Sequence, residues 1–172
     1  MEATKNTGHQ MIVRQAFPDD LAFLRSLALE AFSVYGDYET VLTDFFVSEG
    51  VHTYVAEESR DDGNTPVGIL MMIIRKEKRR GPYFAEIVAI AVEEARRNQG
   101  IGSQMIEFAK QWPLSFSGQI PISEVRLSVA ESNVKGQSFF HRHGFEINRT
   151  EPWTYPAGQK ALRMRYILKK EN

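Results

Sequence analysis

A short basic turn with two glycines, RRNQGIGSQM at residues 96–105, is the segment best suited to hold an anion. Gly100 and Gly102 have no Cβ atoms to keep a ligand away from the backbone, while Arg96 and Arg97 add positive charge. Apolar residues at helical spacing follow the turn, so it opens a helix whose first N–H groups lack intrahelical acceptors. These N–H groups and the helix dipole favour negative charge, and the segment predicts a phosphate or pyrophosphate site.

Known phosphate-binding loops differ from this turn. The dinucleotide fingerprint G-x-G-x-x-G requires glycine where Met105 stands, and the G-K-S/T of a Walker loop is absent. Taken alone, the segment fits equally well a tight glycine turn flanked by solvated arginines. A second motif is needed to decide between the two interpretations.

Glu86 is the charged residue within YFAEIVAIAV at 83–92, a segment that is otherwise apolar on both faces. Such a pattern indicates a strand covered on both sides, at the centre of a sheet. A carboxylate in that position is costly unless it is paired or takes part in chemistry. Glu86 is therefore either a functional residue or a member of a structural ion pair.

Other residues predict less chemistry. RKEKRR at 75–80 lies beside a turn in a chain of net charge -1, which indicates a solvated loop and argues against nucleic acid as a partner. His141 and His143 face different sides of a helix, and His9 and His52 have no partners at ligand spacing, so we predict no metal site. The lack of cysteine excludes disulfides and a cysteine nucleophile.

Length and composition predict an ordinary globular protein. With 172 residues, 42% of them hydrophobic and 25% charged, the chain can bury the core of a single domain, which we place at residues 11–170. No apolar run approaches the roughly 18 residues of a membrane span, so we expect no membrane partner. Residues 1–10 are polar and lack the apolar core of a secretory signal, which predicts a disordered tail and a cytoplasmic protein.

The elements that must position these residues follow from apolar periodicity and turn signals. Pro18 precedes a helical pattern, Pro113 ends the helix that the glycine turn opens, and Gly144 ends another. The predicted strands are residues 11–17, 51–59, 65–77, 83–92, 124–130, 145–150 and 161–168, and the predicted helices are 19–32, 37–49, 101–112 and 133–143. Their order predicts a mixed α/β (α+β) fold.

Two motifs at this spacing resemble the GNAT superfamily of acetyl-coenzyme A dependent N-acetyltransferases. RNQGIG at 97–102 is similar to the family signature R-x-x-G-x-G, and the strand before it resembles the family's central strand. SNVKGQSFFHRHGF at 132–145 is similar to the family element N-x-x-A-x-x-x-Y-x-x-x-G-F. The resemblance extends over roughly 11–168 and implies the GNAT fold, a central mixed, mostly antiparallel sheet of six or seven strands flanked by about four helices.

The resemblance implies acetyl-coenzyme A as cosubstrate, with its pyrophosphate on the backbone N–H groups of residues 98–103. It also implies that the pantetheine arm lies beside residues 90–92 like an added strand, in the space left by two diverging strands. Asn133 fits two roles, a hydrogen bond to that arm or the cap of its own helix. The residues expected to bind the cosubstrate are Ile90, Ala91, Val92, Arg97, Asn98, Gln99, Gly100, Ile101, Gly102, Ser103, Asn133 and Phe140.

The implied reaction moves the acetyl group to a primary amine of a small molecule, peptide or protein by direct attack in a ternary complex. An amine with a pKa of about 10.4 is almost entirely protonated near pH 7, so a proton acceptor is needed. Glu86 matches the glutamate that is the general base in resembling histone and protein acetyltransferases, with the structural ion pair as the alternative. The acceptor is left open, and a homodimer is a habit of the family that the sequence does not decide.

One departure from the family concerns the general acid. Many members carry a tyrosine that protonates the leaving thiolate where this chain has Phe140, which has no proton to give. Tyr155, in EPWTYP between the last two predicted strands, is the candidate substitute, and a loop aromatic is the alternative. The missing tyrosine also leaves open a second function, a catalytically weak domain that binds or senses acetyl-coenzyme A.

Overall fold

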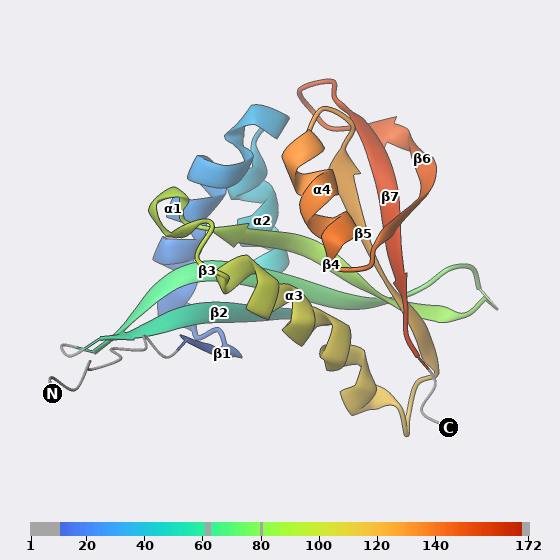
Figure 1. The fold of residues 1–172 in the computed structure, drawn as a ribbon, viewed down its shortest axis with the longest axis horizontal. Coiled ribbons are helices and arrows are strands. Elements are labelled where there is room, and N and C mark those ends of the chain that lie inside the picture. The colour runs from blue at the N-terminus through green and yellow to red at the C-terminus, as the bar shows by residue number, and fades with distance from the viewer. Residues whose placement is uncertain (1–10, 61–62, 80, 170–172) are drawn as a thin grey trace, which may run out of the picture.

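A computed structural model describes residues 11–60, 63–79 and 81–169 as one sheet with helices on both faces (Figure 1). The tail expected at residues 1–10 lies outside the described residues. The strands are β1 (Met11–Gln15), β2 (Val51–Arg60), β3 (Gly63–Lys76), β4 (Tyr83–Val92), β5 (Ile122–Ala130), β6 (Glu146–Thr154) and β7 (Lys160–Ile167). The α-helices are α1 (Leu21–Phe32), α2 (Tyr38–Phe46), α3 (Ile101–Gln111) and α4 (Val134–Arg142).

The strand order across the sheet is β1-β2-β3-β4-β5-β7-β6. β4 and β5 are parallel, and the other neighbouring strands are antiparallel. Within the described ranges the chain has seven strands and four α-helices in the predicted order, which confirms the mixed, mostly antiparallel sheet. None of the helices in these ranges is long and apolar enough to cross a membrane.

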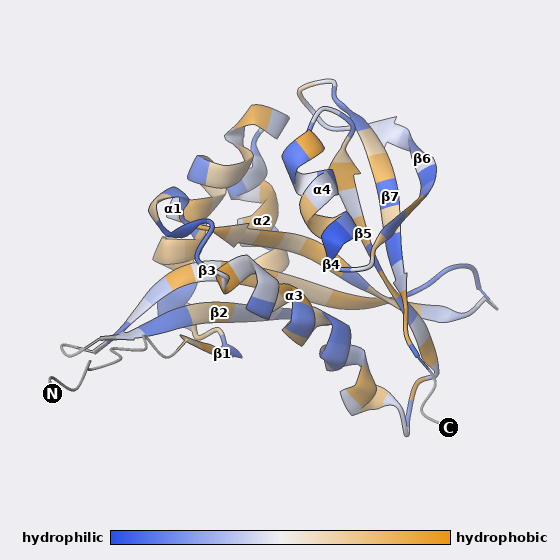
Figure 2. Cartoon of the chain, in the orientation of Figure 1, coloured by the Kyte–Doolittle hydropathy of each residue, from blue (hydrophilic) through white to orange (hydrophobic). Residues whose placement is uncertain are grey.

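Two apolar layers enclose the centre of the sheet because β3 and β4 are apolar on both faces (Figure 2). On one face, Ile69 and Met71 of β3 pack with the apolar residues of α1 and α2. On the other face, Leu70 and Met72 pack with α3, whose buried stripe includes Met105. This alternation follows from the two-residue repeat of a strand, and it holds β4 between two cores.

β4 and β5 separate before either strand ends, and we call the space between them the fork (Figure 1). Their parallel ladder ends where Ile87 pairs with Leu127. The register of β4 against β3 shifts at the same point, between the partners of Met71 and Met72. Val88 is the extra residue of this β-bulge and has no partner in either described ladder, so its backbone borders the fork.

Two details differ from the sequence-based prediction. β6 extends to Thr154, so Trp153 lies on a strand and not on the loop predicted for EPWTYP. The helix predicted from residue 37 begins one residue later, because Asp37 is its N-cap and accepts a hydrogen bond from the N–H of Thr40 at 3.2 Å.

Candidate active site

The glycine turn beyond β4 opens α3 as predicted. Gly100 is the N-cap of this helix and has a left-handed backbone conformation, with φ of 84°. The first hydrogen bond within the helix joins the N–H of Gln104 to the carbonyl of Gly100 at 3.0 Å. The N–H groups of residues 101–103 therefore point out of the helix N-terminus without intrahelical acceptors, as an anion site requires.

Glycine is favoured at the two glycine positions of this turn for different structural reasons. A Cβ atom at Gly100 would meet no atom within 4 Å, so glycine is favoured there by the positive φ and not by close packing. A Cβ atom at Gly102 would lie 3.3 Å from Cζ of Phe139, so glycine there lets α3 and α4 approach each other. Each glycine thus has a reason of its own besides clearance for a phosphate.

The basic residues of the turn are engaged with the protein. Arg96 forms an ion pair with Glu58 on β2. Arg97 donates from Nε to the carbonyl of Val92 at 3.0 Å, and its guanidinium lies 3.6 Å from Glu30 on α1. Arg97 is therefore held at the end of β4, beside the N–H groups that form the anion cradle at the start of α3. Arg96 was expected to face an anion, but its charge is paired with Glu58.

Four more of the predicted cosubstrate residues lie in or beside the turn. Asn98 has a positive φ of 60°, and Gln99 donates from Nε2 to the carbonyl of Ala95 at 3.2 Å. The Oγ of Ser103 lies 3.1 Å from Nε2 of His143, at the end of α4. The side chain of Ile101 is buried in the core. Across the described ranges, no three His, Asp or Glu side chains are grouped to hold a metal ion.

Asn133 and Phe140 belong to α4, on the far side of the fork. Asn133 caps this helix, since its Oδ1 accepts the N–H of Gly136 at 2.9 Å. Gly136 leaves room for the cap, because a Cβ atom there would lie 2.6 Å from Nδ2 of Asn133. Phe140 is buried and packs against Phe145. Both residues also line the pocket in the fork, so Asn133 caps its helix and faces the site.

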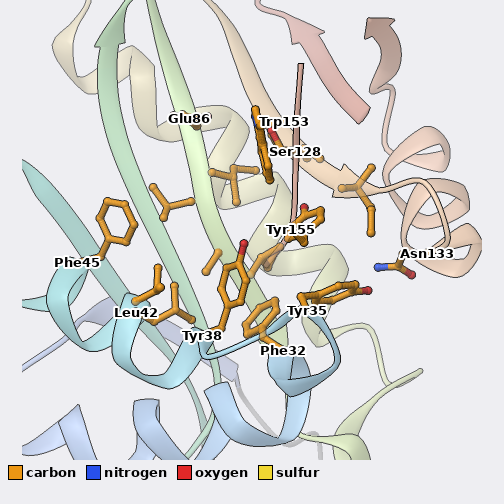
Figure 3. A pocket seen from close by; sticks show the side chains of 18 of the residues that line it. Phe32, Tyr35, Tyr38, Leu42, Phe45, Glu86, Ser128, Asn133, Trp153 and Tyr155 are labelled. Atoms are coloured by element: carbon orange, nitrogen blue, oxygen red, sulfur yellow. The ribbon is translucent and has the colours of Figure 1, made fainter. Parts of the chain in front are cut away.

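A pocket of about 290 Å³ lies in the fork (Figure 3). Residues 86–90 of β4 form one side, and residues 127–130 of β5 form the other. Of the residues predicted to contact the pantetheine arm, Ile90 lines this pocket, whereas Ala91 is buried and packs with α1 and α2. The pocket thus follows the part of β4 that has lost its β5 partner.

Glu86 lines the pocket with both carboxylate oxygens paired. Oε1 accepts a hydrogen bond from Nη1 of Arg163 on β7 at 3.0 Å, and Oε2 accepts one from Arg75 on β3. The side chain of Arg163 is 12% exposed and that of Arg75 is 44% exposed. Glu86 is therefore ion-paired, as expected of a structural residue, and it also lines the pocket, as a functional residue must.

A buried carboxylate on β6 extends this ion-pair chain. Glu151 accepts a hydrogen bond from Nε of Arg163, so Arg163 lies between two carboxylates. Burial opposes ionisation of Glu151, but the hydrogen bond and charge of Arg163 outweigh burial, and the pKa of Glu151 is lowered. Arg163 therefore fixes Glu86 from the protein side, while Arg75 covers it from the more exposed side.

Tyr155 directly follows β6 and packs among aromatic side chains that line the pocket (Figure 3). Its ring centroid lies 5.0 Å from Tyr35, 5.9 Å from Tyr38 and 5.0 Å from Trp153. Burial, and to a smaller extent Tyr38 and Tyr35, raise the pKa of Tyr155, so its hydroxyl stays protonated at neutral pH. Burial raises the pKa of Tyr38 as well.

Four residues of the site are not predicted from the sequence: Tyr35, Tyr38, Arg75 and Arg163. Tyr35 lies in the connection between α1 and α2 and Tyr38 is the first residue of α2, and no local motif marks either of them. Arg75 is hidden in the basic run. A signal existed for Arg163, because a charge within the strand pattern ALRMRYIL needs a partner, and Glu86 is the charge within the central strand.

Known proteins resemble this chain in sequence and in fold. Residues 49–147 match the family described as acetyltransferase (GNAT) domain. The chain is 25% identical over 131 residues, 73% of each chain, to streptothricin acetyltransferase of Escherichia coli. NAA60 of Arabidopsis thaliana in complex with acetyl-CoA aligns with a TM-score of 0.74 at 17% identity, over 92% of this chain and 99% of that one. Spermidine N-acetyltransferase of Vibrio cholerae, in complex with CoA and spermine, aligns with a TM-score of 0.69 at 17% identity, over 92% and 96%.

The family match extends over more than half of the chain and contains β4, the glycine turn and α4. At these sequence identities, the solved structures show that the fold is shared. The chain therefore belongs to the GNAT acetyltransferase family and is an acyltransferase, as its two motifs predict.

Proposed function

We propose that this protein transfers the acetyl group of acetyl-coenzyme A directly to a primary amine, with both substrates in the fork. One observation carries the proposal: the pocket runs along β4 from Glu86 toward the strand end that leads to the anion cradle of α3. The chain has no cysteine on which an acetyl group could be held. Direct attack by the amine is the route that these residues support.

The residues present fit acetyl-coenzyme A. The N–H groups of residues 101–103 would hold its diphosphate, with Arg97 beside them. The pantetheine arm would lie along β4 past Ile87, where the backbone has lost its β5 partner and can pair with an added chain. Asn133 and Phe140 would border the arm from the α4 side. When bound, the cosubstrate supplies the acetyl group as an activated thioester.

Glu86 accepts the proton of the acceptor amine in this proposal. Arg163 keeps Oε1 in place, while the guanidinium on Oε2 belongs to the half-exposed Arg75. An incoming ammonium group carries the same charge as Arg75 and can replace it on Oε2, so the carboxylate stays paired throughout the exchange. Transfer of the ammonium proton to Oε2 then leaves a neutral amine beside the pocket.

Two further groups in the fork can donate hydrogen bonds. The bulge at Val88 leaves a backbone unit without a ladder partner, and its N–H is the candidate donor to the acyl oxygen. We retain Tyr155 as the candidate donor to the leaving sulfur. Its raised pKa keeps the hydroxyl protonated, so it can donate a hydrogen bond, but makes it a weak acid. A thiolate with an ordinary pKa of about 8.5 leaves without full protonation.

The names of the similar proteins agree with an amine acceptor. One is a streptothricin acetyltransferase and another a spermidine N-acetyltransferase, both of which act on small molecules by name. The deciding experiment combines calorimetry with coenzyme A and steady-state thiol release from acetyl-coenzyme A with a panel of amines. Amine-dependent release supports the enzyme. Binding without release identifies instead the sensing domain that Phe140 leaves open, and a lack of binding contradicts both.

A further inference from the structure

The pocket has an aromatic wall that acetyl transfer itself does not require. Its members come from α1, α2, the connection between them, β6 and the residue that follows β6 (Figure 3). Their rings contact one another, as in the 6.0 Å pair of Phe32 and Tyr38 and the 5.0 Å pair of Trp153 and Tyr155. The wall consists of Phe32, Tyr35, Tyr38, Phe45, Trp153 and Tyr155.

Charge is scarce in this pocket. Among the described residues that line it, Arg75 and Glu86 are charged. The two acids at the start of α2 are used elsewhere, since Asp37 caps the helix and Glu39 pairs with Arg25. A second ammonium group on an acceptor would therefore find no free carboxylate in the pocket. Aromatic faces attract a cation, but this attraction does not replace a missing counter-charge at a buried site.

A bridge between two connections holds the aromatic wall in place. It joins residues 34–36, between α1 and α2, to residues 156–159, between β6 and β7. The N–H of Ala157 donates to the carbonyl of Tyr35 at 3.2 Å. The Nε2 of Gln159 donates to the carbonyl of Val34 at 2.8 Å. The aromatic wall is therefore fixed in advance of binding.

Tight packing in the bridge also limits the size of the acceptor. Gly36 lies so close to Pro156 that a Cβ atom at position 36 would be 2.7 Å from Cβ of the proline. A pocket of about 290 Å³ is small for a ligand site, and the acyl arm takes part of it. The remaining room suits a compact group beside the reacting nitrogen.

We propose that the acceptor is a monoamine whose nitrogen is joined by a short linker to an aromatic or apolar group, and that polyamines are poor acceptors. The inference rests on the proposed function. The nitrogen lies at Glu86 while the apolar group packs against Tyr38 and Trp153, where burial and ring packing stabilise it. In the transfer, Glu86 first takes one proton from the ammonium group. The bond from the neutral nitrogen to the acetyl carbon then forms, the carbon–sulfur bond breaks, coenzyme A leaves as thiolate, and the second nitrogen proton goes to that thiolate.

Thiol release from acetyl-coenzyme A by the full chain tests this with 2-phenylethylamine, heptylamine and 1,6-diaminohexane. The last two have equal numbers of heavy atoms and differ in a terminal methyl or ammonium group. We expect kcat/KM for the two monoamines to exceed that for the diamine by roughly tenfold or more. A diamine that equals heptylamine overturns the inference and leaves the proposed function intact. No release with these amines or spermidine, although coenzyme A binds, overturns the proposed function itself.

A peptide that begins with phenylalanine presents the same chemistry as a free arylalkylamine. The assay therefore includes phenylalanylglycine amide beside 2-phenylethylamine. A higher kcat/KM for the peptide identifies a polypeptide N-terminus as the source of the amine, and a lower one identifies a free amine. A kcat/KM above that of the diamine for either the peptide or 2-phenylethylamine supports the inference. Values below that of the diamine for both contradict it.

Three variants at two positions on the pocket wall separate contact with the acceptor from a general loss of activity. Trp153 is 39% exposed and Val41 is 36% exposed, so both positions tolerate change. Trp153→Ala should lower kcat/KM for 2-phenylethylamine roughly tenfold and change that for the diamine less than about twofold. Val41→Asp should shift the diamine-to-heptylamine ratio upward roughly tenfold, and the isosteric Val41→Asn should not. The inference is overturned if Trp153→Ala changes kcat/KM equally for 2-phenylethylamine and the diamine, and Val41→Asp leaves the diamine-to-heptylamine ratio of kcat/KM unchanged.

Discussion

The two ends of the pocket are built in different ways. In the proposed reaction, the donor end is mainly one continuous stretch, residues 88–103, with Asn133 and Phe140 beside it. It presents backbone N–H groups whose direction is set by a bulge, a positive φ and a helix start. The acceptor end consists of side chains from α1, α2, β3, β4, β6 and β7. Backbone groups keep their chemistry when side chains change, whereas each substitution at the acceptor end alters the surface that an amine meets. The donor end is therefore the constant part of the site.

The largest effect is expected at the acceptor end, from Glu86→Gln. Glutamine has nearly the same shape but cannot accept the proton, so kcat/KM at pH 7 should fall about 10²- to 10⁴-fold. The loss should shrink as pH rises, because more of the amine is already neutral. Rates measured from pH 7 to 10 check this prediction. A constant ratio between variant and natural enzyme over that range would remove Glu86 from proton transfer.

The next largest effect is expected at the donor end, from Gly100→Asp. A Cβ atom there has open space, and Asp and Asn adopt a positive φ more readily than other residues with side chains. Two unit charges about 8 Å apart repel by about 2 kcal/mol at an effective dielectric near 20, so coenzyme A should bind roughly thirtyfold more weakly. Calorimetry measures this. Gly100→Asn, which has the same shape without the charge, should retain most of the affinity, and equal losses would argue against an anion cradle.

The two arginines on Glu86 should respond in opposite ways. Arg75→Gln removes the half-exposed competitor of the amine, so KM for the acceptor should fall about two- to fivefold. Arg163→Gln leaves the partly buried Glu86 and the buried Glu151 without their shared cation, which should destabilise the fold by roughly 3–5 kcal/mol. Acceptor titrations and urea denaturation separate the two effects. A raised KM in the Arg75 variant would show that the guanidinium assists the amine and does not compete with it.

The smallest effect is expected from Tyr155→Phe. Because folding raises the pKa of Tyr155, the unfolded chain loses this proton first at high pH. The free energy of unfolding should thus be unaffected below the ordinary tyrosine pKa of about 10 and fall as pH rises beyond it. The decline should be shallower in Tyr155→Phe, as denaturation at pH 8 and pH 11 would show. At neutral pH, kcat should fall less than tenfold, and a larger loss would make Tyr155 the general acid.

The sequence was sufficient to predict the glycine turn, the helix that it opens and the order of the elements. The glycine turn, its helix and the strand that carries Glu86 are adjacent in the chain, so local spacing contains their geometry. The acceptor end depends on contacts between distant segments. Arg163 meets Glu86 across the sheet, and Trp153 lies on β6 because that strand continues through an irregular register with β7. Periodicity within a single segment contains no information on either contact.

The bridge also determines how far the fork can open. Beyond Ile87, β4 and β5 have no further pairs in the described ladder, so the sheet continues as two arms that could hinge about that point. The contact of Gly36 with Pro156 joins the α1–α2 connection on one side of the fork to the β6–β7 connection on the other, which closes the fork into a ring. A larger side chain at position 36 would spread this ring. In the proposed reaction, the girth of the acceptors that fit would therefore depend partly on a glycine that does not line the pocket.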